Sequence, residues 1–98
     1  MPYLVNWAES ASRELEKVYL FLAEKNEESA QAAIKAIREK ALLLEQFPNA
    51  GRPLEDFEPE YRELLIPFGG AGYVLIYEVI GYSVVYVLTL KHQNEAGH

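Results

Sequence analysis

The stretch from Tyr61 to Lys91, which reads YRELLIPFGGAGYVLIYEVIGYSVVYVLTLK, decides the fold of this chain. Strand-forming residues run over 61–67, 72–80 and 83–91, and both intervals between these runs contain glycine. Successive strands joined by glycine-containing turns predict an antiparallel meander. Tyr, Val, Ile and Leu fill both alternating sets of positions in the last two strands. Both faces of the sheet should therefore be at least partly covered.

The beginning of the chain predicts one more strand and a first helix. A short strand is expected at residues 3–7, where Tyr3, Val5 and Trp7 alternate with Leu4 and Asn6. The helix that follows should be capped by Ser10 or Ser12. Its inner stripe follows the i, i+3, i+4, i+7 spacing at Leu15, Val18, Tyr19 and Leu22.

A second helix should begin at Asn26, a good N-cap residue that precedes two acidic residues. Pro48 ends this helix at residues 46–47, and we expect the turn-rich connection over 48–59 to be solvated. The predicted fold is a single α+β domain over residues 1–98, of order β-α-α-β-β-β, with the helical hairpin packed on a small antiparallel sheet. The second helix buries a stripe formed by Ala30, Ala33, Ile34, Ile37, Ala41 and Leu44.

The composition excludes several classes of site. The chain contains no cysteine, so it has no disulfide, no cysteine nucleophile and no thiolate metal site. Its two histidines are too few to form a metal site without other ligands. The apolar run over residues 3–8 is too short for a signal peptide or a membrane span. We therefore expect a soluble cytoplasmic protein.

The charge is unevenly distributed along the chain. The net charge is −6, and residues 1–52 carry eight acidic and seven basic groups. Residues 53–98 carry seven acidic groups against two basic ones, Arg62 and Lys91, which gives this half a net charge of −5. Such a surface repels phosphates at long range, although a small local pocket can still be positive.

Several motifs in the second half resemble those of one protein family. Residues 47–53, FPNAGRP, are similar to a helix-ending FP..GRP segment, and Arg62-Glu63-Leu64 resembles an R-x-L strand start. Residues 68–77, FGGAGYVLIY, are similar to an FGGSGYV..LY hairpin, and residues 92–97, HQNEAG, resemble a closing RHQREAGY. The order and spacing of these motifs resemble those of the RelE/ParE family of small bacterial toxins.

The resemblance implies a type II toxin that inhibits growth until a cognate antitoxin masks it, without a metal or organic cofactor. RelE-like members cut mRNA on the ribosome with basic residues and a general acid or base. ParE-like members poison DNA gyrase and lack that set of residues. We expect ParE-like action. RelE-like cleavage is one alternative, and a non-toxic family relic that only binds a partner is another.

If the chain is a ribonuclease, its candidate catalytic residues are Arg62, Lys91 and His92. Cations would stabilise the charge on the phosphorane, and a histidine would transfer protons. The family's closing motif is altered here, because Lys91 and Asn94 replace arginines and His98 replaces a tyrosine. Losing two guanidinium groups weakens a phosphate clamp, while His98 offers a substitute acid. Strand alternation also places Lys91 and His92 on opposite sides of a strand.

Structural roles compete with these chemical ones. Arg62 lies beside Glu63 and suits a cross-strand ion pair. Arg52 suits the carbonyl groups at the end of the second helix, and His92 suits a cap on the last strand. Three tyrosines resemble a base-stacking platform, but we expect core or half-buried rings whose hydroxyls reach the surface. These are Tyr73, Tyr77 and Tyr86.

The helices also offer a possible partner surface. Four large apolar residues lie off the two helical stripes and would leave apolar surface on the hairpin, which suits an antitoxin. The alternative is that they complete the core against the sheet and the connection over residues 48–59. An exposed sheet edge is a second place for an antitoxin segment. The four residues are Leu20, Phe21, Leu42 and Leu43.

Overall fold

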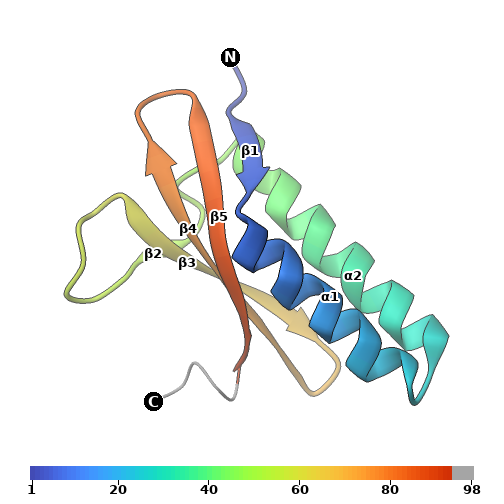
Figure 1. Ribbon diagram of the computed structural model, residues 1–98. Helices are drawn as coiled ribbons and strands as arrows, with labels where there is room; N and C mark the ends of the chain where they lie inside the picture. Colours follow the sequence, from blue (N-terminus) through green and yellow to red (C-terminus); the bar gives the residue numbers. More distant parts are fainter. Residues whose placement is uncertain (94–98) are drawn as a thin grey trace.

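The computed structural model describes residues 1–93. The predicted order of one strand, two helices and three strands is confirmed, and a two-residue strand adds to it within the expected connection (Figure 1). The elements are β1 (Leu4–Trp7), α1 (Glu9–Ala23), α2 (Glu27–Leu42), the 3-10 turn η1 (Leu43–Glu45), β2 (Arg52–Pro53), β3 (Tyr61–Phe68), β4 (Ala71–Ile80) and β5 (Val84–His92).

The strands form one sheet in the order β1-β5-β4-β3-β2. The meander β3-β4-β5 is antiparallel, as predicted, but β1 pairs in parallel with β5, so the sheet is mixed. The parallel pair is fixed at both ends, where Leu4 N–H donates to the Ser83 carbonyl and Ala8 N–H donates to the Val87 carbonyl. Alternation in residues 3–7 predicts a strand but not its neighbour, because the partner lies at the other end of the chain.

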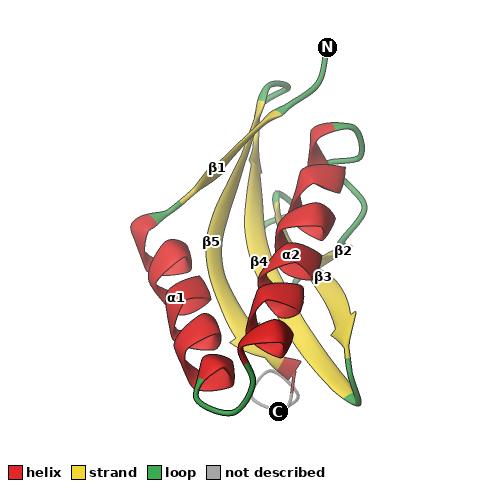
Figure 2. Cartoon of the chain, turned by 90° about the vertical axis from the view of Figure 1, so that its right-hand side faces the viewer, coloured by secondary structure: helices red, strands yellow, loops and turns green. Residues whose placement is uncertain are grey.

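Both helices lie on the same face of the sheet, as Figure 2 shows from the side of the hairpin. The core forms between them and the sheet, where alternate residues of the strands point toward the helices. On β4 these residues are Tyr73, Leu75 and Tyr77, which are all buried. They belong to the same core cluster as Ile37 of α2 and Leu44 of η1. The predicted packing of a helical hairpin on a sheet is therefore confirmed.

The two helices begin differently. Asn26 caps α2 as predicted, and its side chain accepts a hydrogen bond of 3.0 Å from Ser29 N–H. The predicted cap of α1 is wrong, because the helix starts at Glu9 after Ala8, which offers no side-chain cap. Ser10 instead donates to the Leu88 carbonyl at 2.8 Å and ties the first turn of α1 to β5. No helix among residues 1–93 has the length and apolar character needed to cross a bilayer.

Candidate functional site

Two polar side chains on the helix-facing side of the sheet hold the segment that follows the helices. The Tyr77 hydroxyl accepts a hydrogen bond from Gly51 N–H at 2.9 Å and donates one to the Pro48 carbonyl at 2.7 Å. The Arg62 guanidinium donates to the carbonyls of Gly51, at 2.6 Å, and Asn49, at 3.4 Å. We call these contacts the Tyr77–Arg62 clamp. The clamp therefore gives Arg62, one of the candidate catalytic residues, a structural role.

The environment of Tyr77 keeps its hydroxyl neutral. Burial raises the pKa of Tyr77 above its ordinary value, while the bond to Gly51 and the charge of Arg62 act in the opposite direction. The prediction that this hydroxyl reaches the surface is wrong, because the residue is fully buried and its partners are backbone groups. Tyr73 is also buried and has a raised pKa, whereas Tyr86 is partly exposed.

Two arginines have structural roles that differ from those expected. The cross-strand ion pair at this site joins Arg52 Nε to a Glu63 carboxylate oxygen at 3.5 Å, so the prediction that Arg62 forms it is wrong. Arg62 instead donates to the carbonyls of Asn49 and Gly51, which lie beyond the end of the second helix. Arg62 cannot share the side of Glu63, because the two residues are neighbours and point to opposite faces of β3.

Lys91 and His92 end β5 on opposite faces of the sheet, as alternation predicts. His92 pairs across the sheet with Tyr73, and the two rings meet edge to face at 5.6 Å between centroids. Lys91 pairs with Val74 and is exposed. It borders a shallow hollow of about 340 Å³ together with Glu14 of α1.

The described geometry does not bring the three candidate catalytic residues together. Arg62 lies opposite Tyr77 on β4, whereas His92 lies opposite Tyr73, four residues away. At strand spacing this is a separation of about 13 Å along the sheet, and buried Leu75 lies between the two positions. Lys91 faces the other way. His98 and Asn94, the other residues of the closing motif, lie outside the described residues.

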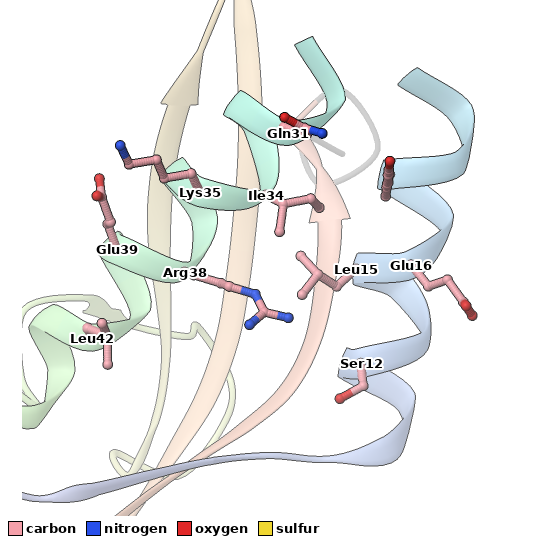
Figure 3. A pocket seen from close by; sticks show the side chains of 10 residues that line it. Ser12, Leu15, Glu16, Gln31, Ile34, Lys35, Arg38, Glu39 and Leu42 are labelled. Atoms are coloured by element: carbon pink, nitrogen blue, oxygen red, sulfur yellow. The ribbon is translucent and has the colours of Figure 1, made fainter. Parts of the chain in front are cut away.

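A groove of about 670 Å³ runs between α1 and α2 on the outside of the hairpin (Figure 3). Leu15 and Ile34 form its apolar floor, where they point toward each other from the two helices. The Tyr19 hydroxyl donates to a Glu27 carboxylate at 3.0 Å and ties the helices together at one end. The groove is further lined by Ser12, Glu16, Gln31, Lys35, Arg38, Glu39 and Leu42.

Arg38 is the residue that gives this groove a chemical preference. Its side chain extends from α2 across the groove toward α1, between the positions of Leu15 and Ser12. It forms no ion pair with an acidic side chain among residues 1–93. An exposed guanidinium at the rim of an apolar groove is suited to a carboxylate on an otherwise apolar partner.

The four predicted partner-binding residues are all exposed, so they do not complete the core. They do not form one patch either. Leu42 lines the groove between the helices, while Leu43 lines a second hollow of about 350 Å³ between α2 and β3. Leu20 and Phe21 lie near the turn that joins the two helices, and the Lys25 ammonium lies 5.1 Å from the centroid of the Phe21 ring.

Comparison with known families decides the relationship of this chain. The model of the family described as the ParE toxin of the type II toxin-antitoxin system parDE matches residues 5–97. The chain belongs to the ParE toxin family. The resemblance inferred from the motifs is thereby confirmed, and the chain is a toxin-antitoxin toxin of the ParE/RelE superfamily. No curated protein matches the chain significantly.

Solved structures agree with this ParE toxin family assignment. A chain of the chromosomal ParDE toxin-antitoxin system from P. aeruginosa superposes with a TM-score of 0.76 at 25% identity, covering 92% of this chain and 95% of that one. The toxin-antitoxin complex RelBE2 from Mycobacterium tuberculosis gives a TM-score of 0.66 at 23% identity, with 94% and 99% coverage. The second likeness concerns the fold alone.

Proposed function

We propose that this ParE-family chain acts in the cytoplasm as a growth-inhibiting toxin whose target is DNA gyrase rather than ribosome-bound mRNA. The observation that carries the proposal is the match to the ParE toxin family over residues 5–97. The described geometry supports it, because Arg62, Lys91 and His92 do not converge on one point. Arg62 is also engaged with backbone carbonyls, which leaves fewer donors for a phosphate.

The charge distribution also supports gyrase over mRNA as the target. Stabilising a phosphorane needs cations close to the reacting group, and their effect is lost when anions surround them. Residues 53–98 carry Arg62 and Lys91 against seven acidic groups. The strands of the sheet therefore give little attraction for RNA. A protein target such as gyrase does not require a positive sheet.

We further propose that the cognate antitoxin covers the helical hairpin. The groove between α1 and α2 has an apolar floor and two cations, Lys35 and Arg38, that form no ion pair among residues 1–93, so it suits an amphipathic antitoxin segment that carries an acidic residue. Leu42 belongs to this groove, whereas Leu43, Leu20 and Phe21 are exposed outside it. The neighbouring RelBE2 structure is a toxin-antitoxin complex, which agrees with such a partner.

The target is tested by induced expression of the chain, with growth, mRNA primer extension and supercoiling by purified gyrase measured in parallel. We expect growth arrest, inhibited supercoiling and no new mRNA ends. Lys91→Ala is the sharpest variant, because Lys91 is exposed and its loss leaves the core intact. It should keep full toxicity in a gyrase inhibitor and lose it in a nuclease.

Other results would contradict the proposal in distinct ways. New ribosome-dependent mRNA ends that disappear in Lys91→Ala would establish the RelE-like alternative. A chain that accumulates to normal levels without arresting growth would establish the family relic. Arg62→Ala is less informative, because it removes the contacts to Gly51 and Asn49 and lowers stability in either case.

The antitoxin surface is tested by co-expression with the small protein encoded beside the toxin. Arg38→Glu should prevent growth rescue while leaving toxicity unchanged. Arg13→Glu is the control, because Arg13 lies on α1 outside the groove and the substitution changes the net charge equally. Equal rescue of both variants would place the antitoxin elsewhere.

A further inference from the structure

The sheet has a second face that neither helix covers (Figure 1). Strand alternation assigns side chains to this face, because their neighbours Tyr77, Val85 and Val87 belong to the core. We call it the open face. Large side chains on it are partly exposed, including Leu65 at 41% and Ile80 at 45%. Further residues of the open face are Leu4, Tyr61, Glu78 and Tyr86.

One row of the open face combines aromatic rings with a carboxylate. The register pairs Tyr61 of β3 with Glu78 of β4, and Glu78 with Tyr86 of β5. Directly opposed residues in antiparallel strands lie about 5 Å apart, so the two rings flank the carboxylate. Phe57 adds a third aromatic ring beside this row, because its ring meets the Tyr61 ring edge to face at 6.3 Å between centroids.

The row is negatively charged and its central acid lacks a cationic partner. Glu78 forms no ion pair with a cation among residues 1–93. Its charge is the main cause of the raised pKa of Tyr61, and burial, the charges of Glu58 and Glu60, and a hydrogen bond to Glu78 raise this pKa further. The negative potential at this end of the sheet is therefore the sum of several carboxylates.

Charge and shape together define what would bind here. A carboxylate between aromatic rings attracts an ammonium or guanidinium group by ion pairing and by interaction with the ring faces. Ile80 and Leu4 beside the row, and Leu65 four residues farther along β3, are suited to aliphatic side chains of the same partner. Phosphates are repelled by the same acids, so this face disfavours nucleic acid.

We propose that the open face binds a basic segment of a partner protein, with a lysine or arginine of that segment seated over Glu78 between Tyr61 and Tyr86. This site is separate from the groove between the helices, which carries Arg38 and attracts acidic groups. The two faces of the molecule therefore select partners of opposite charge. A protein held on one face leaves the other accessible.

The proposal is tested with the whole chain and a short capped peptide of alternating lysine and leucine. Amide signals of the protein are followed by nuclear magnetic resonance during titration at low salt. We expect shifts that cluster at Tyr61, Glu78 and Tyr86 and an affinity that falls as salt is added. Glu78→Gln should weaken binding about fivefold. Glu28→Gln, on exposed α2 surface, changes the net charge equally and should have no effect.

Three results would overturn the proposal. Equal weakening by Glu78→Gln and Glu28→Gln would mean that only the net charge attracts the peptide. Equal binding of a peptide with glutamate in place of lysine, or of oligouridine RNA, would exclude a basic protein segment as the occupant. Shifts of the same residues on dilution of the protein alone would assign the face to a second copy of the chain. Tyr86→Thr provides a second variant if Glu78→Gln folds poorly, and it should also weaken binding.

Discussion

The two faces of the sheet carry similar side chains in different roles. On the helix-facing side, Tyr77 and Arg62 bind backbone groups of the segment that follows the helices. On the open face, Glu78 lies one position along β4 from Tyr77, Tyr86 lies opposite Glu78 on β5, and neither residue is buried. The difference teaches that residue type alone does not identify a functional site in this fold. Whether a polar group is already satisfied by the fold decides what it is available to do.

The largest expected effect is the loss of stability when a core side chain is truncated, compared with the same truncation on the open face. Leu75→Ala removes a fully buried side chain from the helix-facing side and should lower the free energy of unfolding by about 2–5 kcal/mol. Leu65→Ala on the open face should cost under about 1 kcal/mol, because this side chain is already exposed. Urea denaturation measures both. Similar losses would mean that the open face is covered in solution.

A second pair of variants compares hydroxyl groups. Tyr77→Phe leaves Gly51 N–H and the Pro48 carbonyl without their partner and should lower stability by about 1–3 kcal/mol. Tyr86→Phe is the matched control and should change stability by less than about 0.5 kcal/mol, because its hydroxyl makes no described hydrogen bond. The comparison uses the same chemical change on neighbouring strands. A neutral Tyr77→Phe would show that water replaces the lost hydroxyl.

Gly51 explains why the clamp is tight. A Cβ atom at this position would lie 2.8 Å from the Tyr77 hydroxyl oxygen and closer still to the Glu63 carbonyl. The glycine of the FPNAGRP segment therefore permits the backbone to approach β3 and β4. This segment, one of the motifs that carry the family resemblance, is held in place by Tyr77 and Arg62.

Local patterns predicted most of the fold. The meander over residues 61–91 follows from alternation and glycine turns, and Asn26 caps its helix as its residue type suggests. The parallel pairing of β1 was not predictable, because its partner is distant in sequence. The cap of α1 failed for a related reason, since Ser10 has a distant acceptor at Leu88.

The candidate sites were less predictable than the fold. Strand alternation predicts that Arg62 and Glu63 lie on opposite faces of the sheet. It does not predict which of these faces contacts the segment over residues 48–51. The groove between the helices was missed, although a signal exists, because Ile34, Arg38 and Leu42 recur at four-residue spacing on one helix. The prediction singled out apolar residues and gave no role to the cation among them.

The smallest expected effect is a pH dependence of the stability difference between wild type and Tyr77→Phe. The pKa of Tyr77 is raised in the folded protein, so folding favours its neutral form. The stabilisation is fully present below the ordinary tyrosine pKa of about 10 and is lost as the pH rises through the folded pKa. The stability difference between wild type and Tyr77→Phe should therefore shrink above pH of about 10. Urea denaturation at several alkaline pH values measures this. A difference for Tyr77→Phe that stays constant would show that the Tyr77 hydroxyl titrates as freely in the folded chain as in the unfolded one, because equal pKa values in the two states remove any dependence of stability on pH.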